Sequence, residues 1–287
     1  MKPKVRWPLV VASVVLALIV ALCIYDKLYL DGINYYLHHF LFTSAEPTPP
    51  VTTIDPDQKR SRVLFVTFDN RPDAPFVKMH NESLQRYCQA AGHTYLFLSD
   101  GFPSDIPVYW YKVLALQKYL GTGEYDCVCW LDSDTVVVNQ GYDVQQLLSS
   151  YPLSHIFLGR DEPVLSIVGL DSDIIKSPTL NAGFLMVRNT DTGRAFVDDC
   201  VDHYYKNRSK CVDPDTGAVR GLYATTCYEQ GAIDELVWTK YEKETAFLSN
   251  DLIKNTFHCK PKPETFILHV NFTSAEYREQ CFAQFLF

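Results

Sequence analysis

Hydrophobic positions follow one pattern at the start of the chain and another in the rest of it. Residues 7–25 form an apolar stretch without a charged side chain, and Lys2, Lys4 and Arg6 precede it. This length is about what an α-helix needs to span a bilayer. Because basic flanks stay in the cytoplasm, the pattern predicts a retained membrane anchor followed by a translocated C-terminal part. A cleaved signal peptide is the alternative, although its apolar core is usually shorter.

A predicted stem and linker follow the anchor. Residues 26 to about 44 mix aromatic residues with His38 and His39, which is typical of a membrane-proximal stem. Residues 45–60 contain Pro47, Pro49, Pro50 and Pro56, and this composition is typical of an extended linker. Hydrophobic periodicity then begins again. The sequence therefore predicts a cytoplasmic tail (1–6), a transmembrane anchor (7–25), a stem or linker (26–60) and a folded domain (61–287).

In the predicted domain, short apolar runs alternate with longer amphipathic stretches. Strands that alternate with helices imply an α/β fold with a mostly parallel sheet flanked by helices. Ligands of such sheets bind at the carboxyl ends of the strands, so we expect the chemistry there. The predicted strands are 62–68, 93–98, 127–131, 156–158, 183–187 and 266–270. The predicted helices are 76–91, 109–120, 191–205 and 229–238.

Composition fits a globular domain and narrows the class of partner. Hydrophobic residues make up 47% and charged residues 21% of the chain, and both values are ordinary. The formal net charge of -8 argues against nucleic acid as a partner, because phosphate contacts need clustered Lys and Arg.

The cysteines and glycosylation sequons agree with a translocated domain. Eight of the nine cysteines lie outside the predicted anchor, and an even number permits disulfides in an oxidising compartment. Cys127 and Cys129 lie two apart in an apolar run, which predicts small core residues on one side of a strand. The better disulfide candidates are Cys88, Cys200, Cys211, Cys227, Cys259 and Cys281, and sequons occur at Asn81, Asn207 and Asn271.

An acidic triplet follows the predicted strand at 127–131. Asp132 and Asp134 flank Ser133, and residues two apart on an extended chain point to the same side. Two converging carboxylates form a hard-oxygen site for Mn2+ or Mg2+, and such ions recruit phosphate oxygens. Three other Asp-x-Asp triplets do not directly follow a long apolar strand, and they lie at 55–57, 171–173 and 213–215.

The triplet and three other stretches resemble motifs of a known enzyme class. Residues 130–134 resemble the metal motif of nucleotide-sugar transferases with the Rossmann-like GT-A fold. The closest resemblance within that class is to the galactosyl- and xylosyltransferase family that includes yeast Golgi mannan enzymes. Residues 110–116, 181–189 and 228–232 resemble, in the family's order, the helix before the metal strand, an Asn-x-Gly strand and an acidic-Gln helix start. The resemblance covers about residues 62–271.

The resemblance implies a metal site and a nucleotide-sugar as co-substrate. Asp132 and Asp134 would hold the metal and the donor, and His269 matches a late histidine that supplies a further ligand in many such enzymes. A core histidine is the alternative for His269. The family often has a Gly soon after this histidine, whereas Asn271 and Phe272 follow here.

The remaining candidates concern the donor and the catalytic step. Each also has a structural explanation, such as a strand exit, an exposed helix, a bulge before a strand or a helix start. The implied donor-binding residues are Thr67, Asp69, Lys112, Asp132, Asn181 and Gly183. The implied catalytic candidates are Glu229, Gln230 and Asp234.

The expected reaction moves a sugar from a nucleotide-diphosphate donor to a hydroxyl of a glycan or glycoconjugate, and the resemblance implies retention of configuration. Together with the anchor and the sequons, it predicts a single-pass type II membrane protein of the Golgi or ER with a lumenal catalytic domain. Two alternatives stay open. A haloacid-dehalogenase-type phosphatase would use Asp132 as its nucleophile, although that motif normally opens its domain. A noncatalytic, membrane-anchored carbohydrate-binding protein would not need Asp132, Asp134 and His269 together.

Overall fold

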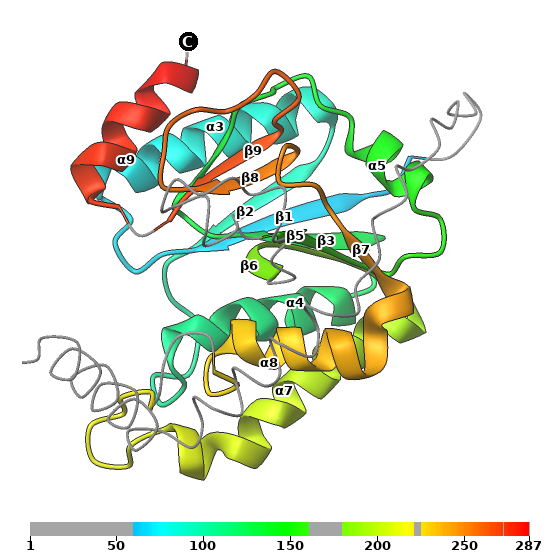
Figure 1. Cartoon of the computed structure of the whole chain (residues 1–287), viewed down its shortest axis with the longest axis vertical. Coiled ribbons are helices and arrows are strands. Elements are labelled where there is room, and N and C mark those ends of the chain that lie inside the picture. The colour runs from blue at the N-terminus through cyan, green and yellow to red at the C-terminus, as the bar shows by residue number, and fades with distance from the viewer. Residues whose placement is uncertain (1–59, 161–179, 221–224, 272, 287) are drawn as a thin grey trace, which may run out of the picture. The chain divides into compact units, whose positions relative to one another are not determined.

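The computed structural model covers most of the predicted catalytic domain, and its described residues all belong to the unit Glu46–Phe287. Within these residues, no helix is both long and apolar enough to cross a membrane. The predicted anchor at 7–25 and all but the last residue of the predicted stem at 26–60 lie outside them. The structure describes residues 60–160, 180–220, 225–271 and 273–286 (Figure 1).

A sheet of six strands forms the central layer of this unit (Figure 1). The strands are β1 (Val63–Phe68), β2 (Thr94–Leu98), β3 (Cys127–Leu131), β5 (Ile156–Arg160), β6 (Leu180–Arg188) and β7 (Thr245–Phe247). They lie in the order β2-β1-β3-β6-β5-β7. β6 is antiparallel to both of its neighbours, and the other pairs are parallel. The sheet is therefore mixed, which corrects the prediction at β6, because a buried apolar run does not encode strand direction.

Helices cover both faces of this sheet, as predicted. In Figure 1, α4, α7 and α8 lie together on one side of the sheet, and α3 lies on the other. The first group is α4 (Tyr111–Gly121), α7 (Asp191–Cys211) and α8 (Glu229–Leu236), which continues into a π-helical turn at Val237–Tyr241. The second face is covered by α3 (Pro75–Ala91) and α5 (Val144–Ser150).

Side chains of the central strands alternate between these two buried layers. Leu64 and Val66 of β1 pack toward α4 and α7, whereas Val63 and Phe65 pack toward α3. Burial on both faces explains why these strands read as continuous apolar runs in the sequence. It also explains why such short runs could be recognised as strands.

A second, smaller sheet packs over the face that carries α3 and α5. Its order is β4-β9-β8, and it is not predicted by the sequence. The predicted strand at 266–270 corresponds to β9 and belongs to this small sheet rather than to the main one. The three strands are β4 (Thr135–Val137), β8 (Ile253–Thr256) and β9 (Ile267–Val270). β4 begins directly after the acidic triplet and pairs Thr135 with His269, so this sheet brings the late histidine to the triplet.

Several elements escape the sequence prediction because they are short. β4, β7 and β8 have three or four residues, and α5 has seven. Runs of this length show no periodicity that separates a helix from a strand. The last of the missed elements is α9 (Ala275–Phe282), a charged helix of eight residues near the C-terminus.

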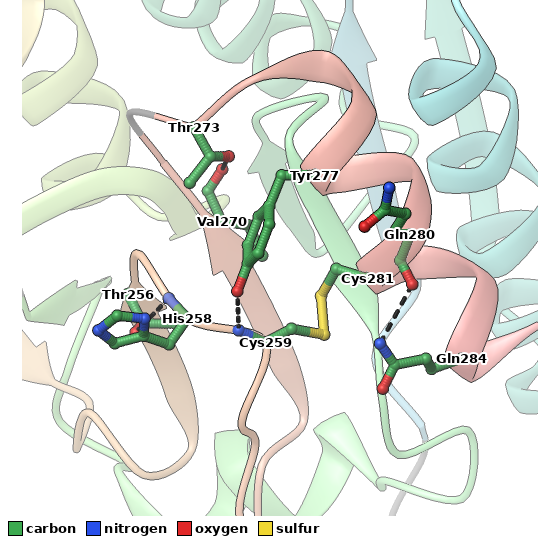
Figure 2. The surroundings of a disulfide bond; sticks show 9 residues. All are labelled: Thr256, His258, Cys259, Val270, Thr273, Tyr277, Gln280, Cys281 and Gln284. Atoms are coloured by element: carbon green, nitrogen blue, oxygen red, sulfur yellow. Dashed lines mark hydrogen bonds between the residues drawn. A yellow bond between two sulfur atoms is a disulfide. The ribbon is translucent and has the colours of Figure 1, made fainter.

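Two disulfides in the described chain each connect a helix to a neighbouring loop segment. Cys211–Cys227 ties the end of α7 to the segment before α8, and Cys259–Cys281 ties the loop after β8 to α9. Figure 2 shows this second bridge, next to the backbone N–H of Cys259, which donates to the hydroxyl oxygen of Tyr277 at 3.0 Å.

The other cysteines of the described chain are buried free thiols. Cys127 and Cys129 lie in one core layer, which confirms the prediction for this pair. Cys88 and Cys200 are also unpaired, so their selection as disulfide candidates is wrong. They lie on opposite sides of the main sheet, in separate core layers, so they cannot pair with each other.

Candidate active site

The acidic triplet lies in a tight turn that joins β3 to β4. The amide and the hydroxyl of Thr135 both donate to the carbonyl oxygen of Asp132, at 3.2 and 2.8 Å. Asp132 and Asp134 do converge, as the sequence predicts. The cause is this turn, however, and not an extended chain between the two residues.

Two donors orient the carboxylate of Asp132. The indole N–H of Trp130 donates to Oδ1 at 2.6 Å, and Lys112 Nζ lies 3.2 Å from the same oxygen. The side chain is 26% exposed, so it reaches solvent while remaining fixed. The cost of desolvating a carboxylate at a strand end is thus met by protein donors.

Asp134 lies between two partners on the far side of the turn. Its Oδ1 is 3.0 Å from His269 Nε2, and its Oδ2 is 3.0 Å from the guanidinium of Arg278 on α9. Burial alone would raise the pKa of Asp134, but attraction and hydrogen bonding from His269 and attraction from Arg278 lower it to about 2. Asp134 is therefore ionised at neutral pH.

The ring of His269 is buried and oriented from behind. Its Nδ1 lies 2.7 Å from Oδ1 of Asn255 on β8, and the amide nitrogen of Asn255 donates to the carbonyl of Arg160. The amide oxygen therefore faces the ring, and Nδ1 carries a proton. Nε2 donates to Oδ1 of Asp134 at 3.0 Å, and loss of this proton would leave a lone pair on Nε2 for a metal.

Asp132, Asp134 and His269 fit a divalent cation. One ligand atom of each residue lies within 4.8 Å of the other two. Two carboxylate oxygens and one imidazole nitrogen suit Mn2+, and the carboxylates also suit Mg2+. The hydrogen bond from His269 to Asn255 is the kind of support that orients a ligating imidazole. The three residues that the sequence analysis assigns to the metal are thus brought together.

Lys112 and Glu229 form a buried ion pair beside Asp132. Lys112 Nζ lies 3.0 Å from Glu229 Oε1, and the two side chains are 4% and 1% exposed. Burial opposes the charge of Lys112, but attraction from Asp132 and Glu229 dominates and raises its pKa. Burial raises the pKa of Glu229 despite the attraction of Lys112. Lys112 is therefore a buried cation that links Asp132 to Glu229, and not an exposed lysine on a helix surface.

The Asn-x-Gly motif forms a β-bulge in β6. Pairing with β5 shifts after Leu158, so that residues 182–184 have no partner on that strand. The side-chain oxygen of Asn181 accepts a hydrogen bond from the N–H of Gly183 at 2.8 Å. The structural explanation for this motif, a bulge, is therefore correct.

The bulge turns the peptide groups of Ala182 toward α4 and α8. The carbonyl of Ala182 accepts from Lys112 Nζ at 3.1 Å, and its N–H donates to the side-chain oxygen of Gln230 at 3.1 Å. Gln230 thus fixes the peptide group whose carbonyl binds Lys112, and it is not among the described residues that line the cavity.

Gly183 makes room for the metal-site histidine. A Cβ at this position would lie 2.3 Å from Cε1 and 2.5 Å from Nδ1 of His269. No side chain fits in that space. The space beside Gly183 is therefore occupied by the His269 ring.

Thr67 and Asp234 do not line the cavity formed by the described residues. The Thr67 hydroxyl lies 2.9 Å from Nε2 of His80 and 3.0 Å from the carbonyl of Leu131, in the core. Asp234 accepts a hydrogen bond from the indole of Trp238 at 3.0 Å. Both side chains are buried.

Asp69 directly follows β1, next to the triplet. Its Oδ1 accepts from the backbone N–H of Arg71 at 2.7 Å, and its Oδ2 accepts from the hydroxyl of Ser133 at 2.6 Å. Burial would raise the pKa of Asp69, but the hydrogen bonds from Arg71 and Ser133 lower it overall. Ser133 therefore ties the acidic turn to the neighbouring strand end.

A cavity of about 440 Å³ opens at the carboxyl ends of β1 and β3, where the sheet architecture predicts a ligand. Carboxylates and cations face it from several elements, so it suits a ligand that carries both phosphate and hydroxyl groups. Its charged residues are Asp69, Arg71, Lys112, Asp132, Asp134, Glu229 and Arg278.

Two arginines of this cavity are not predicted from the sequence. The guanidinium groups of Arg71 and Arg278 lie 5.3 and 5.4 Å from the centre of the same Phe76 ring. Arg71 follows the strand-end Asp69 by two residues, and the strand-end rule could have indicated it. Arg278 lies on the unpredicted helix α9, and no sequence motif points to it.

The fold is that of a glycosyltransferase. The structure aligns with the crystal structure of a glycosyltransferase involved in the glycosylation of the major capsid of PBCV-1, with a TM-score of 0.57 and 15% identity. The match covers 78% of this chain and 99% of that one. This fold and the acidic site agree with the resemblance of the sequence to GT-A nucleotide-sugar transferases.

Sequence similarity points to the same class. The chain is 25% identical over 176 residues to an alpha-1,2-galactosyltransferase of Schizosaccharomyces pombe, covering 52% of this chain and 47% of the relative. It is 23% identical over 188 residues to an uncharacterized alpha-1,2-galactosyltransferase of the same yeast, covering 55% and 50%. The chain spans about half the length of these curated relatives. No protein-family model matches it. The similarities confirm the resemblance to GT-A transferases and disfavour the phosphatase alternative.

Proposed function

We propose that this protein is a metal-dependent glycosyltransferase that moves a sugar from a nucleotide-diphosphate donor to a hydroxyl of a glycan or glycoconjugate. The observation that carries the proposal is the convergence of Asp132, Asp134 and His269 beside the buried Lys112–Glu229 pair in one cavity. A cluster of potential metal ligands occurs by itself in many proteins. A metal group beside a buried cation and a buried carboxylate suits a substrate with a charged leaving group and a neutral sugar.

The metal end of the cavity suits the diphosphate. Asp132, Asp134 and His269 would hold Mn2+ or Mg2+, which when bound stabilises the negative charge of the leaving diphosphate. Arg278 and Arg71 add guanidinium groups on the same side of the cavity. Guanidinium groups stay charged at all relevant pH values and match phosphate oxygens in geometry.

The Lys112–Glu229 pair suits the transferred sugar. Among the residues that the structure describes, neither carboxylate oxygen of Glu229 accepts a hydrogen bond of good geometry, although Oε1 is paired electrostatically with Lys112. A buried carboxylate with unused acceptor capacity can receive a sugar hydroxyl. Its negative charge can also stabilise positive charge that develops on the sugar ring.

The names of the relatives support a first choice of donor. Both are named alpha-1,2-galactosyltransferases, so a nucleotide-diphosphate galactose is the first donor to test. In a retaining transfer, the bond from the anomeric carbon to the phosphate oxygen breaks and a bond to the acceptor oxygen forms on the same face. The acceptor's proton passes to the departing phosphate oxygen, and no dedicated protein base is needed.

We also propose a type II membrane topology with the catalytic domain in the lumen of the Golgi or ER. The apolar stretch at 7–25 and its basic flank support an anchor of this orientation. The two disulfides support an oxidising compartment for the folded unit.

The direct test uses the full chain, purified in detergent, with Mn2+ and a panel of nucleotide-diphosphate sugars. Release of nucleoside diphosphate, increased by a glycan acceptor, is expected for one donor. Asp134→Asn should lower this turnover by more than about 100-fold, because it removes a metal ligand outright.

Asp215→Asn is the matched control, since Asp215 belongs to another Asp-x-Asp triplet and is exposed. It should leave the turnover unchanged. Absence of turnover with every donor, or equal turnover by Asp134→Asn and wild type, would overturn the proposal. Glycan binding without turnover would favour the carbohydrate-binding alternative.

A further inference from the structure

A small aromatic surface stands at the rim of the cavity. Val108 and Tyr109 line the cavity and are 45% and 41% exposed. The ring of Tyr228 meets that of Tyr109 edge to face, with centroids 5.0 Å apart. Within the described chain, only two other large hydrophobic residues are exposed to this degree, Leu153 and Tyr205. The rim surface formed by Val108, Tyr109 and Tyr228 therefore concentrates exposed apolar area at the mouth of the charged cavity.

The buried residue Trp110 fixes the turn that carries the rim surface. Val108 and Tyr109 belong to the 3-10 turn Val108–Trp110, whose last residue is 2% exposed. The Trp110 indole N–H donates to the carbonyl of Cys227 at 3.2 Å. The Trp110 ring packs against the ring of Tyr204, with the ring centroids 4.9 Å apart. The buried tryptophan anchors the turn, so the exposure of the preceding tyrosine does not arise from a loose loop. A fixed, exposed aromatic side chain beside a cavity marks a binding surface.

The contacts of the site place the rim surface beside the sugar end of the cavity. Arg278 and Asp134 form one end, and Lys112 connects Asp132 to Glu229. Tyr228 directly precedes Glu229 along the chain. Tyr109 precedes Lys112 by three residues, about one helical turn, so it lies on the same side of this helical segment. The rim surface thus adjoins the Lys112–Glu229 pair.

We propose that Val108, Tyr109 and Tyr228 form a subsite that stacks on a pyranose ring of the acceptor glycan. This inference rests on the proposed function. The donor sugar is tethered through its diphosphate to the metal end, whereas the acceptor must enter from solvent and pass this rim. The C–H face of a pyranose packs on the flat apolar face of an aromatic ring, and its hydroxyl groups remain free at the edge. Stacking there would direct an acceptor hydroxyl toward the sugar held at Lys112 and Glu229.

The test compares Tyr109→Ala, Tyr109→Phe and Tyr205→Ala with wild type, all as full chains in detergent. Tyr205 is an exposed tyrosine of α7 that does not line the cavity, so Tyr205→Ala is the matched control. With Mn2+ and the active donor, Tyr109→Ala should raise the acceptor KM about tenfold, which corresponds to about 1.4 kcal/mol. The donor KM should change by less than about twofold, which corresponds to about 0.4 kcal/mol. Tyr109→Phe keeps the ring and should restore the acceptor KM.

A direct binding measurement separates this inference from the proposed function. Saturation-transfer NMR with methyl α-mannoside and methyl α-galactoside needs no catalysis. Loss of the signal in Tyr109→Ala, with retention in Tyr109→Phe and Tyr205→Ala, would support the subsite even if no donor is turned over. An unchanged acceptor KM and an unchanged signal in Tyr109→Ala would overturn it. A rise in donor KM instead, or an equal loss in Tyr109→Phe, would also overturn the stacking of an acceptor ring on Tyr109.

Discussion

Residues that do not face the cavity determine where the metal-site side chains lie. Gly183 leaves the space that the His269 ring occupies, and Asn255 fixes the ring's orientation through Nδ1. Neither residue could hold a metal in this arrangement. Both nevertheless decide whether Nε2 of His269 points at Asp134.

Replacing Gly183 tests this dependence. A Cβ in Gly183→Ala would overlap the His269 ring, so the ring must leave its place beside Asp134. We expect Mn2+ affinity to fall by about 10- to 100-fold, the range found when support for a ligand is lost. Isothermal titration of the purified variant with Mn2+ measures this. Gly121→Ala is the control, because a Cβ there meets nothing within 4 Å. Equal affinity of Gly183→Ala and wild type would contradict the role of Gly183.

His80 predicts a pH dependence of stability. It is buried between Thr67 and Thr135, and burial lowers its pKa from 6.5 to about 4. Between these two values the unfolded chain binds a proton that the folded chain does not, so stability decreases as pH falls through this window. A shift of this size corresponds to about 3 kcal/mol between pH 7 and pH 4. Urea unfolding at several pH values should show a flatter profile for His80→Gln than for wild type, whereas His258→Gln, at an exposed histidine, should keep the wild-type profile.

Helix α9 is an element whose position depends on cross-links rather than on its own length. Eight residues are too few for a stable isolated helix. The Cys259–Cys281 disulfide and the contact of Cys259 with Tyr277 hold it against the loop after β8 (Figure 2). In this position Arg278 reaches both the carbonyl of Val270 and the carboxylate of Asp134. The disulfide therefore supports a cation of the cavity.

Removing this disulfide should affect stability and ligand binding together. Cys259→Ser/Cys281→Ser is expected to lose about 3 kcal/mol of unfolding free energy for a loop of this length. It should also weaken nucleoside-diphosphate binding, because Arg278 is no longer fixed. Arg278→Met should weaken binding without the large loss of stability. Combining both changes should weaken binding no further than Arg278→Met alone, since they act through one group. Additive losses in the combined variant would show that the disulfide does not act through Arg278.

The elements that could be predicted from the sequence are those with a strong local pattern. β3 has the predicted bounds because its five residues are apolar and buried on both faces. α3 ends at Ala91, as predicted, because the next residue, Gly92, adopts a left-handed conformation with φ of 72°. Strand direction in β6 and the membership of β9 in a second sheet depend on contacts between distant segments. No local pattern encodes such contacts, so both predictions required correction.

In the candidate site too, residues marked by a local pattern could be predicted, whereas residues placed by long-range contacts could not. Asp132 and Asp134 could be predicted because they directly follow a recognisable strand. His269 could be included only through the resemblance, since pairing of β9 with β4 brings it close. The chain's own pattern gave no sign of Arg278, because a charged helix of eight residues looks like a solvated surface.

At the scale of the whole folded unit, the metal residues join two separate sheets. Asp132 follows β3 of the main sheet, and His269 lies on β9 of the small sheet. Asp134 lies in the turn that connects the two. A cation shared by these residues would therefore cross-link the layers, and its binding should stabilise the unit against global unfolding and not only order a loop.

This linkage gives a prediction for thermal unfolding of the full chain. Mn2+ at about 100 times its Kd should add about 2.7 kcal/mol to the free energy of unfolding, because it binds the folded state and not the unfolded one. For a domain of this size the midpoint should rise by roughly 5–10 °C, and a chelator should reverse the rise. Scanning calorimetry with and without Mn2+ measures it. Asp134→Asn should abolish the rise, whereas Asp215→Asn should keep it. If wild type and Asp134→Asn gain the same midpoint shift, the ion binds elsewhere and the site at the β3–β4 turn is not its ligand set.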